Sequence, residues 1–123
     1  MSSNVCIVSP VTQQIKACIP LKYTRTPEEQ RLGMMYQAKM DYALAFVYSD
    51  IAPRRMWMKN VKFPLDMVFC RKNVIVQIQG SVPVCDQPEC PVVESLPSDL
   101  VLELPGGWAS SLHLRVGDIV TYK

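Results

Sequence analysis

The chain has 123 residues, of which 49% are hydrophobic and 20% are charged. These values are typical of one folded domain and exclude disorder throughout the chain. The formal net charge of +2 is small for a dedicated nucleic-acid binder, and the single histidine, His113, excludes a mechanism that needs two imidazoles in one chain. Ten prolines and five glycines predict many turns and few long helices.

The first residues predict strands. A short apolar run over Asn4–Val8 is typical of an edge strand, and residues 1–14 are predicted to form an N-terminal extension or edge strand. From Ile15 to Leu21 apolar residues alternate with others, which predicts a half-buried strand. Pro20 favours a position at a sheet edge or at a strand end. A single compact β-rich domain is predicted over residues 15–123.

The N-terminal segment also bears on localisation. A secretory signal needs a basic start followed by an unbroken apolar run, and polar residues such as Ser9, Thr12 and Lys16 interrupt the run here. No stretch approaches the ~18 consecutive apolar residues of a membrane span. We therefore expect a cytoplasmic protein that does not contact membranes or, for a viral product, a protein of the host cytoplasm or the virion.

The clearest helix start in the chain follows Arg25. Thr26 is a favourable N-cap residue, Pro27 fits the first helical position, and Glu29 completes a capping-box pattern. Gly33 is typical of a helix end. The pattern therefore predicts a helix that begins after Thr26 and lasts about two turns.

The rest of the chain is predicted to consist mostly of strands and loops. Strands are predicted over residues 43–48, 65–70, 74–79 and 100–104, and a closing strand follows the turn at 116–118. The polar break at 71–73 predicts a hairpin. Residues 49–55 predict a turn, the four prolines of residues 82–99 predict a long loop, and residues 108–112 predict one or two helical turns.

Together these elements favour an α+β domain that is mainly β. We predict a small barrel-like or strongly coiled sheet, antiparallel or mixed, with one or two short helices. Closure into a barrel would remove the exposed edges of so many short strands.

Five cysteines at irregular spacings do not resemble the disulfide framework of a secreted protein. Cys85 and Cys90 lie together in a proline-rich segment, and three interpretations stay open for them: a local disulfide, a reduced structural pair, or part of a metal site. A zinc site needs four ligands, and no second pair has such a spacing, so no metal site is predicted. Cys6, Cys18 and Cys70 lie in apolar stretches and are predicted to be small core residues.

Polar residues within apolar stretches are the best candidates for a ligand site. Asp66 lies between two apolar residues and must be paired or hydrogen-bonded, because an isolated buried charge is strongly destabilising. Lys59 and Asn60 are candidate partners. One interpretation is structural, in which Asp66 caps and pins the turn over residues 58–64. The other is a small polar pocket of Trp57, Lys59, Asn60 and Asp66 that binds a ligand.

Charged residues are separated along the chain. A basic segment, residues 54–72, contains a candidate interaction surface made of Arg54, Arg55, Lys62, Arg71 and Lys72. An acidic segment, residues 85–118, contains six carboxylates and one arginine. Opposite patches of this kind can guide the docking of partners or of a second copy, although exposed charges usually form only a solvated face.

Several motifs resemble those of an uncharacterised family, domain of unknown function 192. The run Trp57-Met58-Lys59-Asn60 and the later Pro64-Leu65-Asp66 resemble its WMKN and PLD signature. Four further segments resemble its other motifs: TPEE at 26–29, Cys85 and Cys90 followed by Pro91, LELPGG at 102–107, and VGD at 116–118. The resemblance covers about residues 15–120 and implies a compact, mostly-β fold, without implying an established reaction.

Two classes of function are considered. The favoured one is a non-enzymatic protein-interaction or assembly module, for example a small virion or accessory structural component. Its partners would be other proteins or further copies of the chain, and it would need no cofactor, membrane or nucleic acid. The alternative is a small-molecule-binding protein or an enzyme that uses the pocket around Trp57, Lys59, Asn60 and Asp66.

Overall fold

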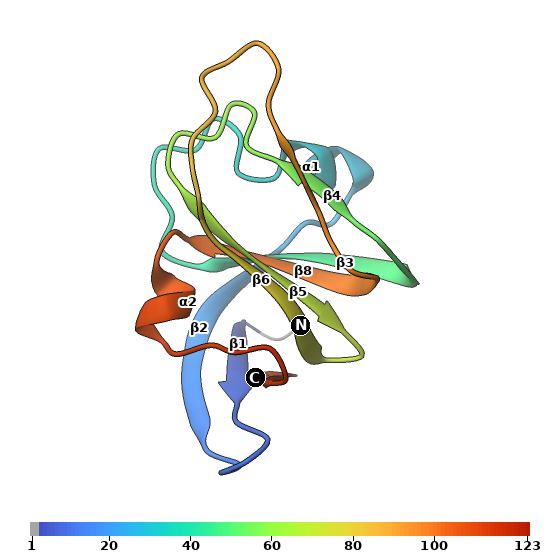
Figure 1. Cartoon of the computed structure of the whole chain (residues 1–123), viewed down its shortest axis with the longest axis vertical. Helices are drawn as coiled ribbons and strands as arrows, with labels where there is room; N and C mark the ends of the chain where they lie inside the picture. The colour runs from blue at the N-terminus through green and yellow to red at the C-terminus, as the bar shows by residue number, and fades with distance from the viewer. Residues whose placement is uncertain (1–2) are drawn as a thin grey trace.

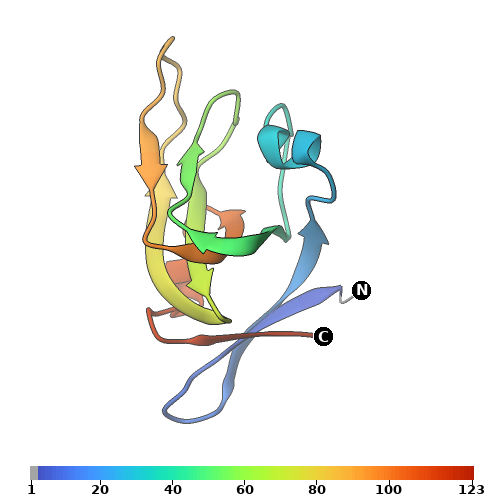
Figure 2. The same ribbon diagram turned by 90° about the vertical axis from the view of Figure 1, so that its right-hand side faces the viewer.

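A closed barrel of seven strands organises residues 3–123, the part of the chain that the computed structural model describes (Figures 1 and 2). Around the barrel the order is β1 (Asn4–Val8), β2 (Ile15–Tyr23), β3 (Ala43–Ala52), β8 (Ser98–Pro105), β5 (Leu65–Arg71), β6 (Val74–Val82) and β9 (Ile119–Tyr122). Among these strands β2 and β3 run parallel, and the other neighbours are antiparallel. The predicted mainly-β fold with a mixed, barrel-like sheet is therefore confirmed.

Strand β1 lies within the ring rather than at an edge. It pairs with β2 on one side and with β9 on the other. The residues at its centre, Val5, Cys6 and Ile7, are fully buried. A strand that looks like an edge or an extension in the sequence thus gains a second neighbour when the end of the chain returns to close the barrel.

The strands β3, β8 and β5 carry a hydrophobic core on each face. Along β8, the residues Leu100, Leu102 and Leu104 belong to the core inside the barrel, whereas Val101 packs into a second core with Phe46. Successive residues of a strand face opposite sides of the sheet. One strand therefore serves both cores, and the second core lies outside the barrel wall.

The helix α1 (Pro27–Leu32) and a two-stranded sheet of β4 (Arg55–Trp57) and β7 (Val92–Glu94) lie at one end of the barrel (Figure 1). Residues of this sheet and of the turn after α1 pack into the second core. The turn predicted at 49–55 and the loop predicted at 82–99 are wrong in part, because β3 extends to Ala52 and β4 pairs with β7. The prolines of the second segment flank β7 instead of interrupting it.

The predicted helix start at Thr26 is confirmed. The Thr26 side chain accepts a hydrogen bond from the Glu29 backbone N–H at 3.0 Å, and Gly33, with φ 51°, ends α1. The Glu29 carboxylate accepts a hydrogen bond from the backbone N–H of Arg25 rather than from that of Thr26, the donor that a capping box uses. The short helix predicted near residue 108 is α2 (Trp108–Ser111).

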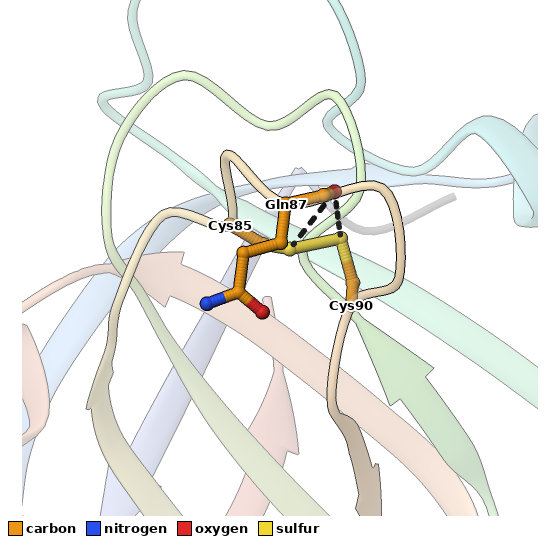
Figure 3. Close-up of a disulfide and its surroundings, with 3 residues drawn as sticks. All are labelled: Cys85, Gln87 and Cys90. Carbon is orange, nitrogen blue, oxygen red and sulfur yellow. Dashed lines mark hydrogen bonds between the residues drawn. A yellow bond between two sulfur atoms is a disulfide. The ribbon is translucent and has the colours of Figure 1, made fainter.

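Four cysteines are paired in two disulfides. Cys6 and Cys18 lie opposite each other in β1 and β2 and are bonded. The prediction that both are small core residues is wrong for Cys18, which is exposed, whereas Cys6 is buried. Opposed positions on antiparallel strands bring their Cβ atoms close together, which allows the bond. Cys85 and Cys90 form the second disulfide, in the loop before β7, and the Gln87 carbonyl oxygen lies 3.8 and 3.9 Å from its two sulfur atoms (Figure 3).

We expect mass spectrometry of the oxidised, folded protein to show Cys6 linked to Cys18 and Cys85 linked to Cys90. Cys70 is buried and free, and burial raises the pKa of its thiol to about 12. It should therefore react with iodoacetamide only after unfolding. Alkylation of Cys70 in the folded protein, or a bridge that includes Cys70, would contradict these pairings.

Candidate functional site

The four residues predicted to form a polar pocket do not come together. Asp66 shares a face of β5 with Val68, which belongs to the core inside the barrel. Trp57, Lys59 and Asn60 flank Met58, which packs into the second core on the other side of the wall. Trp57 and Asp66 line different cavities, so the structure does not bring the four residues together in one pocket.

Asp66 joins three segments of the backbone. Its side chain is buried, with the residue 1% exposed. The carboxylate accepts hydrogen bonds from the backbone N–H groups of Ser81 at 2.7 Å, Gly107 at 3.0 Å and Ala109 at 2.7 Å. These bonds tie β5 to β6 and to the start of α2, and they use none of the predicted partners. Asp66 therefore has a structural role, although not that of pinning the turn over residues 58–64.

Trp57 and Lys59 lie together at the surface. The Lys59 Nζ atom is 5.2 Å from the centroid of the Trp57 ring, within the range of a cation–π interaction. Asn60 has a positive φ of 61°, and its amide donates a hydrogen bond to the Tyr36 hydroxyl at 3.0 Å. Trp57 is 43% exposed and lines a cavity. The other three predicted residues do not line this cavity.

This cavity has a volume of about 170 Å³ and lies between α1 with its following turn, β4, and the outer face of β3 and β8. Its deep walls include the buried residues Met34, Phe46, Val61 and Glu103. Its rim includes the exposed residues Arg31, Arg55 and Trp57. The buried walls are therefore apolar except for one carboxyl group, the half-buried Gln30 adds a polar side chain to the lining, and the rim is basic and aromatic. We call it the Glu103 cavity.

Glu103 is the buried acid of this cavity. The residue is 3% exposed, and its Oε1 atom has no hydrogen-bond partner within residues 3–123. Burial raises the pKa of the carboxyl to about 8, because the charged form is poorly solvated there. At neutral pH the group is protonated and offers both a hydrogen-bond donor and an unused acceptor.

Gly33 lies beside this carboxyl. A Cβ atom at this position would lie 3.4 Å from Cζ of Phe46 and 3.6 Å from Oε1 of Glu103. The backbone φ of +51° also disfavours any residue with a side chain. Both distances are ordinary contacts, so the backbone conformation, and not a lack of space, favours glycine at residue 33.

The predicted basic interaction surface is not continuous. The Arg54 side chain is only 12% exposed, because its guanidinium stacks on Tyr48 at 3.7 Å and bonds to Asp50 at 2.9 Å. The inclusion of Arg54 in an exposed surface is therefore wrong. The remaining members are exposed: Arg55, Lys62, Arg71 and Lys72.

Folding also places the acidic segment beside the basic one. Arg55 lies opposite Glu94 in the pairing of β4 with β7. The backbone N–H of Lys72 donates a hydrogen bond to the Asp99 carboxylate at 3.2 Å. Charges that are far apart in the sequence are thus neighbours in the fold, and they do not form two separate patches of opposite sign.

In the sequence, Glu103 belongs to the acidic segment and to the LELPGG motif at 102–107, and it is not among the predicted site residues. The sequence around it does carry a signal, because Glu103 lies between two leucines in the predicted strand over residues 100–104. A lone carboxyl in an apolar strand is the same pattern that singled out Asp66. The cavity itself depends on contacts between segments far apart in the sequence, for which no local pattern exists.

Within residues 3–123, no group of three or more His, Cys, Asp or Glu side chains could hold a metal ion. One interpretation of Cys85 and Cys90 is that they form part of a metal site. In the structure these two cysteines are bonded to each other. No helix of the described chain is long and apolar enough to cross a membrane.

The fold and the site define a small closed β-barrel with a ligand-sized cavity outside the barrel wall. The chain belongs to the domain of unknown function 192 (DUF192) family, described as "Uncharacterized ACR", which matches residues 9–122. The resemblance of the sequence motifs to this family is therefore confirmed. A search of curated proteins gave no match.

Two solved structures are similar to this one. A candidate transcription regulator from Sinorhizobium meliloti 1021 superposes with a TM-score of 0.86 at 26% sequence identity, over 99% of this chain and 94% of the other. A protein of unknown function from Novosphingobium aromaticivorans DSM 12444 gives a TM-score of 0.83 at 22% identity, over 97% and 84% of the two chains. The second likeness concerns the fold alone.

Proposed function

We propose that the protein binds a small organic molecule in the Glu103 cavity. One observation carries the proposal: a buried carboxyl, with an oxygen that has no partner in the described chain, lines a cavity of about 170 Å³. A buried polar atom without a partner destabilises a fold by about 1–3 kcal/mol, and such atoms are rare in native structures. A ligand that donates a hydrogen bond to Glu103 would remove this penalty.

The size and chemistry of the cavity limit the size of the ligand and the polar groups that it can carry. An apolar cavity of about 150 Å³ is large enough to hold benzene, so the Glu103 cavity suits a molecule built on one six-membered ring. Phe46, Met34 and Val61 supply apolar contacts. The protonated Glu103 favours an uncharged hydroxyl or amide as its partner, because such groups both donate and accept hydrogen bonds.

A protein-interaction module is a second proposal, supported by the exposed side chains of Arg55, Lys62, Arg71 and Lys72. Its electrostatic basis is weaker than the sequence indicates, because Arg54 is enclosed and the acidic segment lies beside the basic one. Exposed charges are common on any folded surface. We therefore favour the binding of a small molecule.

Phenol is expected to bind in the Glu103 cavity, with its hydroxyl donating to Glu103 and its ring among the apolar walls. In protein labelled with 13C at the methionine methyl groups, phenol should shift the NMR signals of Met34 and Met56, which line the cavity. The signal of Met67, which lies in the second core but not at the cavity, should shift less.

Two matched variants make this experiment specific. Val61→Phe should place a ring in the cavity and abolish the phenol-induced shifts. Val84→Phe, at an exposed position of the loop before β7, should leave them unchanged. The proposal is wrong if phenol leaves Met34 and Met56 unaffected in the wild type, or if their shifts persist in the Val61→Phe variant.

A further inference from the structure

We infer that the ligand is a small carboxylic acid with an uncharged hydrogen-bonding group at the opposite end of a flat apolar body. Its carboxylate would bind Arg55 at the rim, and its uncharged group would bind Glu103 inside. The inference rests on the proposed function and adds a ligand class and an orientation to it. It follows from the distribution of charge between the rim and the interior.

The interior carries no ionised group at neutral pH. The ionisable groups around Glu103 come from three elements: Arg31 of α1, Arg55 of β4 and Tyr48 of β3. On the β5 side, its partner in the ladder is the apolar Met67. Tyr48 is neutral, because burial raises the pKa of its hydroxyl further above its ordinary value. The deep end of the cavity therefore accepts an uncharged polar group most readily.

The rim is positive, and Arg55 is its available cation. Arg31 is already paired with Glu28. Arg55 lies opposite Glu94 across β4 and β7, but it makes no ion pair within residues 3–123. Lys59 adds a positive charge beside Trp57. A guanidinium can bind a carboxylate through two parallel hydrogen bonds, so Arg55 suits the acidic end of such a ligand.

A cationic ligand of the same shape fits less well. Its charge would meet Arg55 at the rim in one orientation. In the other orientation it would require Glu103 to ionise inside an apolar cavity. Either arrangement is unfavourable, whereas a carboxylate at the rim requires no change in the protonation of Glu103.

Three probes with the same hydroxyl-bearing ring separate these possibilities: 4-hydroxybenzoate, 4-hydroxybenzyl alcohol and 4-hydroxybenzylamine. Their dissociation constants would be measured at pH 7 from the shifts of the methionine methyl signals. The benzoate should bind about tenfold more tightly than the alcohol, because its carboxylate can form an ion pair and two parallel hydrogen bonds with Arg55, whereas the alcohol offers one uncharged oxygen. The amine should bind more weakly than the alcohol.

Two charge-neutralising variants complete the test. Arg55→Gln should remove the advantage of the benzoate over the alcohol, because it weakens binding of the benzoate much more than binding of the alcohol. Arg71→Gln, at an exposed position outside the cavity lining, should preserve that advantage. Raised salt should reduce it in the wild type, because the rim is exposed to solvent.

The outcomes distinguish this inference from the proposed function. If the alcohol or the amine binds at least as tightly as the benzoate, or if Arg55→Gln weakens the alcohol and the benzoate equally, the carboxylic-acid class is wrong while the binding cavity stands. If neither phenol nor any of the three probes shifts the signals of Met34 and Met56, both proposals are wrong.

Discussion

Replacing Asp66 with alanine should lower the free energy of unfolding by about 3–5 kcal/mol, one of the two largest effects that we expect. The carboxylate accepts hydrogen bonds from three backbone N–H groups, at Ser81, Gly107 and Ala109. Alanine would leave all three donors without this partner, one of them buried and two partly buried. For a domain of this size the melting temperature should fall by about 10–20 °C. Circular dichroism during heating and during urea titration would measure both quantities.

Two further variants separate hydrogen bonding from charge. Asp66→Asn keeps one carbonyl oxygen as an acceptor and should lose less stability than Asp66→Ala. Asp86→Ala removes an exposed carboxylate from the loop before β7 and should change stability by less than about 0.5 kcal/mol. An Asp66→Ala protein that melts at the temperature of the wild type would show that these three bonds contribute little.

The wild-type protein should become less stable as the pH rises from about 5 to 8, and Glu103→Gln should remove most of this loss. Burial raises the pKa of Glu103 from its ordinary value of 4.5 to about 8 in the folded protein. Between these two values the folded state keeps a proton that the unfolded state releases. Unfolding therefore releases a proton, and higher pH favours unfolding.

The size of this effect follows from the difference between the two pKa values. Each pKa unit corresponds to about 1.36 kcal/mol, so the loss between pH 5 and 8 should amount to about 2–5 kcal/mol. Glutamine has a similar shape and does not titrate. The unfolding free energy of Glu103→Gln minus that of the wild type should therefore increase steadily as the pH rises from about 5 to 8.

Urea titrations at pH 5, 6, 7 and 8 would measure these curves for the wild type, Glu103→Gln and a control. The control is Glu94→Gln, at an exposed carboxylate of β7, which should follow the wild-type profile. Parallel profiles for the wild type and Glu103→Gln would mean that Glu103 ionises normally in the folded protein.

Features encoded by adjacent residues could be predicted from the sequence. The hairpin between β5 and β6 turns at Lys72 and Asn73, which both have positive φ, and the polar break at 71–73 predicts it. The N-cap at Thr26 and the stop at Gly33 also depend only on local backbone chemistry. Each of these elements has a signal within a few residues, so a local sequence pattern is enough to predict it.

Features that depend on distant partners could not be predicted in this way. β4 becomes a strand because β7 pairs with it, and no pattern near Arg55 encodes that partner. The Cys6–Cys18 disulfide requires the register of β1 against β2. The burial of Glu103 requires α1, β3 and β4 to cover one face of β8, which turns an apparent surface charge into the centre of the candidate site.

The alternation of residues along β8 has a consequence for how this domain can diversify. Leu100, Leu102 and Leu104 hold the barrel together, whereas Val101 and Glu103 face the second core and the cavity. Of these two residues only Glu103 lines the cavity, so a substitution there changes the cavity lining while the leucines on the opposite face of β8 stay in place. Under the proposed function, mutation on one side of a single wall could therefore change the ligand, while the other side preserves the architecture that makes the cavity possible.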